Sequence, residues 1–237
     1  MILVIFISCL ITGGLLGFVI APKAEYVLGL AKAYIPGTLV ISLSYWFLYF
    51  SGIKNAAFMN GLTAILQGGS LLGYLIFGYL FISILNKLKT SITADEKLVL
   101  QKLIRRTLLG ISIVTGNTFI ITTFGKAQHL GEMLDFFKTS GYAVWFLYFI
   151  MTVEPIGGLG ILLHPKLKTG VLATIGLMLI MIGAVYTHWH NNDPFSDSYD
   201  AVTQLIILSL MLLLYYFEKK ANTKAGGAYP PMAIDIA

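Results

Sequence analysis

The 237-residue sequence is 57% hydrophobic, carries only 11% charged residues and has a mean hydropathy of +0.82. A soluble domain has about 25% charged residues to cover its surface, so this composition excludes an ordinary water-soluble enzyme and indicates a protein whose solvent is lipid. The net charge of +5 is too small and too scattered for a nucleic-acid reader, and we expect no nucleic-acid partner. Because Cys9 is the lone cysteine, any redox chemistry would depend on a bound cofactor.

Apolar runs along the chain predict the membrane spans. A transmembrane helix needs about 20 mostly apolar residues. Such runs lie at residues 2–20, 35–50, 58–85, 108–124, 142–163, 170–189 and 201–217. We therefore predict an all-α membrane protein with about seven transmembrane helices. The first run lacks the Lys or Arg of a secretory signal, so we interpret it as a retained span with a translocated N-terminus.

The placement of positive charge predicts the orientation. With seven spans, one side of the membrane collects 13 lysines and arginines, while the other side has Lys54, Lys126 and Lys138. The positive-inside rule puts the richer side in the cytoplasm. We therefore expect a multi-pass protein of the cell (inner) membrane, with its N-terminus outside and its C-terminus cytoplasmic.

The basic segment after the third run predicts the domain organisation. Residues 1–86 form three N-terminal transmembrane helices, 87–107 a basic cytoplasmic loop or amphipathic helix, 108–218 a four-helix transmembrane bundle and 219–237 a loose tail. Thr93 followed by Asp95 and Glu96 is typical of a helix start. An amphipathic helix should therefore lead directly into the fourth span.

Glu154 is the ionisable residue that the sequence places deepest in the membrane. It lies about 18 Å along the fifth run from its outer end, close to the bilayer midplane. A charge at this depth is costly and marks a functional candidate. Glu154 is either a proton acceptor or donor for a bound ligand, or a neutral carboxyl hydrogen-bonded to a neighbouring helix.

Two polar residues of the fourth run are candidate partners of Glu154. Asn117 lies at a similar depth, and small polar residues of this kind commonly hold membrane helices together, so packing is its favoured role. Lys126, near the outer end, either extends to the outer surface or points inward and neutralises an acid.

Histidines form a second polar group at the outer side. His188 and His190 end the sixth run, and His129 should lie at the same level. Side chains two positions apart on a helix diverge by about 200°, so we predict no metal site. We interpret the group as a polar collar around a quinone headgroup or a proton entry path, with a plain interfacial rim as the alternative.

No nucleotide-binding, hydrolase or metalloprotease motif occurs in the sequence, and we assign no catalytic residue. A set of spaced residues does run through the C-terminal part: Arg105-Arg106, Gly110, Gly116, Gly125-Lys126, Ser140-Gly141, Glu154, Gly157-Gly158 and His188. As a set, over residues 105–217, these resemble the DoxX and DoxX-like family of membrane proteins.

The resemblance implies a four-helix transmembrane bundle with Lys126 and Glu154 as its polar pair and Arg105 with Arg106 as a cytoplasmic motif. Members of the family are associated with quinone-linked sulfur oxidation and with thiol or oxidative-stress redox complexes. The first three runs are not part of the usual pattern. Without a cysteine pair, thiol exchange is not intrinsic to this chain.

Three hypotheses for function follow. The leading one is a subunit of a membrane redox or respiratory complex, not catalytic on its own, with no intrinsic cofactor and a quinone or lipid pocket around Glu154. The alternatives are a purely structural or assembly subunit of a larger membrane complex, or a small proton-coupled transporter. The expected partners are membrane lipid and other membrane protein subunits.

Overall fold

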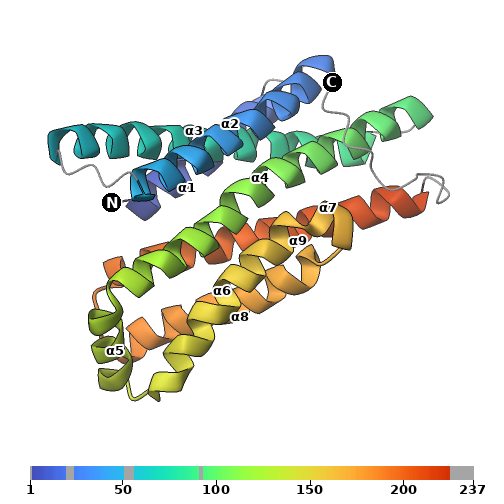
Figure 1. Cartoon of the computed structure of the whole chain (residues 1–237). Helices are drawn as coiled ribbons and strands as arrows, with labels where there is room; N and C mark the ends of the chain where they lie inside the picture. Colours follow the sequence, from blue (N-terminus) through green and yellow to red (C-terminus); the bar gives the residue numbers. More distant parts are fainter. Residues whose placement is uncertain (1, 20–23, 51–55, 91–92, 225–237) are drawn as a thin grey trace. The chain divides into compact units, whose positions relative to one another are not determined.

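The computed structural model describes residues 2–19, 24–50, 56–90 and 93–224, and the regular secondary structure of these segments consists of helices joined by short turns (Figure 1). Six helices in the described part are long and apolar enough to cross a membrane. A shorter apolar helix precedes them, with Ile5–Val19 as its apolar stretch. The predicted class, an all-α multi-pass membrane protein, is confirmed.

Each predicted run coincides with one long helix. The elements are α1 (Ile2–Val19), α2 (Ala24–Phe50), α3 (Ala56–Thr90), α4 (Ala94–Gln128), α5 (Leu130–Thr139), α6 (Val144–Leu162), α7 (His164–Leu167), α8 (Gly170–His190), the 3-10 helix η1 (Phe195–Ser198) and α9 (Tyr199–Lys224). Helix α2 begins well before the predicted residue 35. It continues through Pro36, which lies inside the helix. Membrane helices tolerate an internal proline, since neighbouring groups satisfy the freed carbonyl.

Helix α4 begins with a reciprocal cap. The Thr93 hydroxyl accepts a hydrogen bond from the Glu96 amide at 3.3 Å, and the Thr93 amide donates to the Glu96 carboxylate at 3.0 Å. This capping box satisfies amides that a helix start otherwise leaves unpaired. The 35 residues of α4 form one continuous helix, so the predicted amphipathic segment does lead directly into the fourth span.

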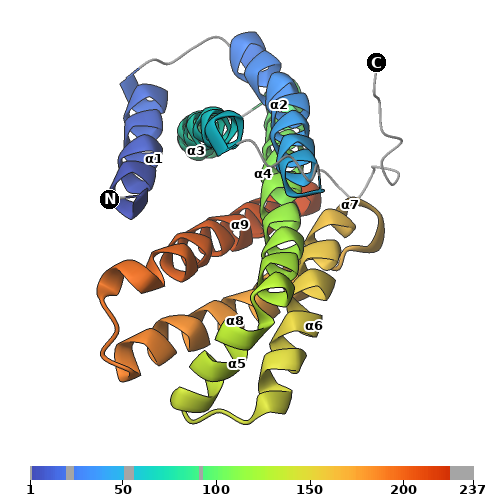
Figure 2. The same cartoon turned by 60° about the vertical axis from the view of Figure 1, so that its left-hand side comes forward.

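The chain packs into two compact units, whose boundaries fall inside α4 and α9. The first unit contains α1, α2, α3, α4 as far as Val114 and α9 from Leu214 onward. Its helices α1 and α3 lie side by side (Figure 2). A Cβ atom added at Gly13 or Gly78 would overlap a backbone carbonyl of the facing helix, so these glycines permit the close approach.

The second unit contains α4 from Thr115, the helices α5 to α8, η1 and α9 as far as Leu213. Glycines of α6 set its packing. A Cβ at Gly158 would lie 2.5 Å from the Gly116 carbonyl oxygen of α4, and one at Gly160 would lie 2.8 Å from the Ala173 Cβ of α8. Helix α6 is therefore in close contact with both α4 and α8.

Three predictions stay open. Two of them fall on residues that the structure does not describe, and the third concerns domain boundaries that it does not test. Lys54, assigned to the outer side, and residues 225–237 of the predicted tail lie outside the described residues. The domain boundaries predicted at residues 86, 107 and 218 stay predictions.

Candidate functional site

An ion pair between α4 and α6 forms the centre of the candidate site. Lys126 Nζ lies 2.5 Å from Glu154 Oε1 and 2.5 Å from Glu154 Oε2. The Glu154 side chain is 2% exposed, whereas that of Lys126 is 27% exposed. The structure thus brings together the acid and the base that the sequence singled out, with the carboxylate buried and the ammonium partly accessible.

Helix geometry explains why Lys126 reaches inward. The Cα–Cβ bonds of a helix tilt toward its N-terminus. Lys126 lies in the last turn of α4, so its side chain starts back along the helix, toward the membrane interior in the predicted orientation. Of the two alternatives for Lys126, the structure has the inward one.

Close packing of the helices supports this ion pair. One turn beyond Glu154 on α6, Gly158 meets Gly116 of α4 with no side chain between the two backbones. Pro155 follows Glu154 directly and lies inside the helix. The buried Glu154 carboxylate thus lies on α6 within one turn of the close contact with α4.

Asn117 lies half-buried on α4 and has interactions of its own, whereas the carboxylate of Glu154 has Lys126 as its partner. The packing role of Asn117 stays a prediction.

The end of α8 forms a second polar pair. The Asp193 amide donates to the His188 carbonyl and the Asn192 amide to the Trp189 carbonyl, at 3.0 and 3.2 Å. Asn192 has a φ of 57°. These bonds and the left-handed residue define a Schellman motif, which turns the chain back over the last helical turn. The Asp193 carboxylate consequently meets His188 Nδ1 at 2.8 Å.

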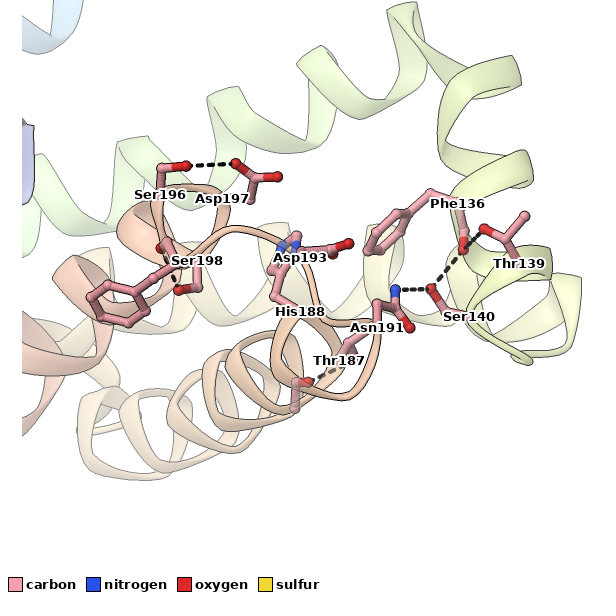
Figure 3. A network of polar contacts seen from close by, with 12 residues as sticks. Phe136, Thr139, Ser140, Thr187, His188, Asn191, Asp193, Ser196, Asp197 and Ser198 are labelled. Carbon is pink, nitrogen blue, oxygen red and sulfur yellow. Dashed lines mark hydrogen bonds and ion pairs between the residues drawn. The ribbon is translucent and has the colours of Figure 1, made fainter.

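A small network ties this turn to the end of α5 (Figure 3). The Asn191 side-chain amide donates to the Ser140 hydroxyl at 2.7 Å, and that hydroxyl donates to the Phe136 carbonyl at 2.7 Å. The rings of Phe136 and His188 lie 5.4 Å apart. Helix α5 is thereby fixed beside the end of α8, and the His188 imidazole lies between a carboxylate and an aromatic ring.

The other histidines of the predicted collar have separate partners. His190 stacks on Tyr186, with ring centroids 5.8 Å apart. His129 Nδ1 lies 3.4 Å from Glu132 Oε1, and both side chains are exposed. Among the described residues no group of three or more His, Cys, Asp or Glu converges as metal ligands do. The collar residues therefore form pairs rather than one centre.

The predicted arginine motif lies in the first unit, apart from the ion pair. Arg105 Nε lies 3.6 Å from Glu218 Oε1 of α9, and Arg106 Nη1 donates to the Leu28 carbonyl of α2 at 3.3 Å. Both arginines therefore join helices of that unit.

Sequence reasoning missed several residues of the second unit. His164 is buried, and its Nδ1 accepts a hydrogen bond from the Gly170 amide at the start of α8. Asp193, the partner of His188, is a second such residue. The run Asn191-Asn192-Asp193-Pro194 carried a usable signal, because Asn at the left-handed position and Pro shortly afterward are typical of a Schellman helix end.

A small cavity lies in the first unit. Its volume of about 10 Å³ corresponds to one water molecule. It is lined by Tyr34, Thr38, Ile41, Ser70, Gly73, Tyr74 and Val114. A site of this size does not hold a quinone ring, so it does not add to the candidate site.

Taken together, the fold and the buried ion pair define a multi-pass α-helical membrane protein with a buried ion pair in its second unit. Residues 111–214 match the model of the DoxX-like family. The match covers less than half of the chain and includes Lys126, Glu154 and His188, while Arg105 and Arg106 precede it. The resemblance predicted from the sequence is thus confirmed for this region. Neither curated proteins nor solved structures gave a match to the chain.

Proposed function

We propose that the chain is a subunit of a membrane redox complex, in which Lys126 and Glu154 bind the headgroup of a quinone-type lipid. The observation that carries the proposal is the asymmetry of the ion pair: Glu154 is buried, whereas the Lys126 side chain is 27% exposed. An ammonium has three N–H donors, and the two carboxylate oxygens engage at most two of them. The third N–H of Lys126 is therefore available to a carbonyl oxygen.

The chemistry of the residues fits such a headgroup. A quinone supplies two carbonyl oxygens that accept hydrogen bonds and that take up protons when the ring is reduced. Lys126 Nζ would donate to one carbonyl, and the Glu154 carboxylate would hold the ammonium in place. The same carboxylate would also balance the positive charge of Lys126, so that no isolated charge is left in the membrane.

Aromatic rings at the outer end of α6 support the proposal. Phe137, Tyr142 and Phe146 form a cluster with ring centroids 5.5 to 6.2 Å apart. Flat apolar side chains of this kind suit the packing of a planar ring. We also propose an orientation in the cell membrane: this end of α6 would face the outside, and the C-terminus would face the cytoplasm.

Quinone binding tests the proposal directly. The purified full-length protein is titrated with a short-chain benzoquinone analogue, and Glu154→Gln and Lys126→Met are compared with the wild type. We expect both variants to bind at least about tenfold more weakly, the effect of losing a hydrogen bond to a charged group. Glu132→Gln is the matched control, because Glu132 is an exposed carboxylate that also has a basic partner. Binding by Glu154→Gln equal to that of the wild type contradicts the proposal.

A second candidate function is a structural subunit that holds a larger membrane complex together. Its support is that Lys126 contacts both oxygens of Glu154 next to the close contact of Gly116 with Gly158. In that case the Glu154→Gln variant loses thermal stability and co-purifying membrane subunits in mild detergent, while no quinone analogue binds even to the wild type.

A further inference from the structure

The beginning of α4 and the end of α9 carry a concentration of positive charge. We call it the basic face; it consists of Lys97, Lys102, Arg105 and Arg106 on α4 and Lys219 and Lys220 on α9. All six belong to the first unit. The basic face is therefore separate from the Lys126–Glu154 pair and does not depend on the function proposed for that pair.

Two contacts hold the basic face together. The Gln101 side-chain amide, 6% exposed, donates to the Ala221 carbonyl at 3.0 Å. The Arg105 guanidinium lies 3.6 Å from the Glu218 carboxylate. Each contact joins the first turns of α4 to the last turns of α9. Lys102 and Lys220 are exposed and lie one position from Gln101 and Ala221, so the first contact brings together the helix turns that carry these two lysines.

Three lysines of this surface have no acidic partner in the part of the chain that the structure describes. Glu218 is engaged by Arg105, and Glu96 by the capping box of α4. Lys97, Lys102 and Lys220 are exposed and form no ion pair with any described residue. The basic face therefore presents an excess of positive charge that a partner from outside the chain would neutralise.

The length of α4 places this excess at the level of lipid headgroups. Its 35 residues extend about 52 Å, whereas the hydrocarbon core is about 30 Å thick. The polar part of α4 before Thr107 accounts for about 20 Å, so it leaves the hydrocarbon core and crosses the headgroup layer. Lysines and arginines at this level are attracted to anionic lipids.

We propose that the basic face binds the phosphate headgroups of anionic phospholipids in the surrounding bilayer. Lys102 and Lys220 would contact the phosphate, while the Arg105–Glu218 and Gln101–Ala221 contacts keep α4 and α9 together beneath it. The partner is a lipid and not a soluble anion, because the helix ends that carry the charges emerge directly from the hydrocarbon core.

Lipid titration of the full-length protein in detergent tests this proposal. Phosphatidylglycerol and phosphatidylcholine are added separately, and bound lipid is measured by native mass spectrometry. The wild type should prefer phosphatidylglycerol, and Lys102→Gln/Lys220→Gln should weaken its binding by about tenfold or more. The control Lys166→Gln/Lys168→Gln removes the same charge from two exposed lysines that the sequence assigns to the same side of the membrane. It should leave binding unchanged.

Several outcomes would overturn the proposal. An equal loss in the two double variants means that net charge alone attracts the lipid. Equal binding of the two lipids by the wild type means that the headgroup charge is not recognised. Displacement of phosphatidylglycerol by millimolar inorganic phosphate means that the basic face is a site for a soluble anion. Helix content measured by circular dichroism verifies that both double variants remain folded.

Discussion

Glu154 has Lys126 as its partner within the described part of the chain, so removing the lysine leaves an unpaired carboxylate on a side chain that is 2% exposed. Loss of one member of a buried ion pair costs about 3–5 kcal/mol. Loss of Glu154 should cost less, because the Lys126 side chain is 27% exposed whereas that of Glu154 is 2% exposed. The effects of substitutions at the two positions on stability should therefore depend on each other, and the effect at Lys126 should be the larger.

We predict that Lys126→Met lowers the midpoint of thermal denaturation in detergent more than Glu154→Gln does. The double variant Lys126→Met/Glu154→Gln should be more stable than Lys126→Met alone, since no stranded charge remains. Midpoints measured at one fixed scan rate for the four proteins give the comparison. Additive effects of the two substitutions would show that the residues do not act as a pair.

Gly158 provides a second test at the level of single residues. A Cβ there would lie 2.5 Å from the Gly116 carbonyl oxygen, a backbone atom that cannot turn aside. Gly158→Ala should therefore destabilise the protein by about 1–3 kcal/mol, as overpacking typically does. Gly176→Ala on α8 is the control, because no described atom lies within 4 Å of a Cβ at that position. The control should be neutral or slightly stabilising in the same thermal assay.

At this scale the sequence named Lys126 as a candidate partner of Glu154 without deciding its direction. It singled out Lys126 and Glu154 because charge in lipid is rare, but left Lys126 to extend either way. The inward direction depends on which helix end faces Glu154, and that is decided by packing between helices. His188 was singled out as well, whereas its contact with Asp193 depends on a backbone turn.

Among the elements, the end of α8 depends on one left-handed residue. Asn192 has a φ of 57°, a left-handed conformation that β-branched residues adopt at a cost of about 1–2 kcal/mol. The Schellman turn that depends on it brings Asp193 to His188. A change at Asn192 therefore alters a side-chain contact in which Asn192 itself takes no part.

We predict that Asn192→Val lowers the thermal denaturation midpoint and loosens the His188–Asp193 contact, while Asn192→Gly leaves both unchanged. Glycine adopts the left-handed conformation without strain. Hydrogen exchange of the last turn of α8 measures the loosening. Equal exchange in the two variants would show that the left-handed residue does not hold the turn.

Helix ends and short helices were the elements that the sequence predicted least well. Helix α5 was not expected, because ten residues with a polar face are too short to appear as an apolar run. Helix α2 was predicted too short, because Lys32 and Pro36 are atypical of a span. The capped start of α4 was predicted correctly, since a capping box depends on residues adjacent in sequence.

At the scale of the whole molecule, the orientation in the membrane is open to a direct test. In a Cys9→Ser background, Lys138→Cys and Lys102→Cys place single thiols at exposed positions on opposite predicted sides. A membrane-impermeant thiol reagent should label Lys138→Cys in intact cells and Lys102→Cys only after permeabilisation. The reverse pattern would invert the orientation, and labelling of both in intact cells would contradict the predicted number of spans between them.

The molecular class followed from composition alone, because lipid imposes long apolar helices on any chain that crosses it. The division into two units with boundaries inside α4 and α9 did not follow, since nothing in a continuous helix marks where its packing partners change.

The order of Lys126 and Glu154 along the chain also bears on how the protein is made. Lys126 precedes Glu154 by 28 residues, so the lysine leaves the ribosome about one to six seconds before the glutamate. Helix α4 can thus enter the bilayer with its cation near the outer interface, where a lysine is tolerated. When α6 follows, its carboxylate meets a counter-ion already in the membrane. Because the lysine comes first, α6 is not inserted with an uncompensated anion in the lipid.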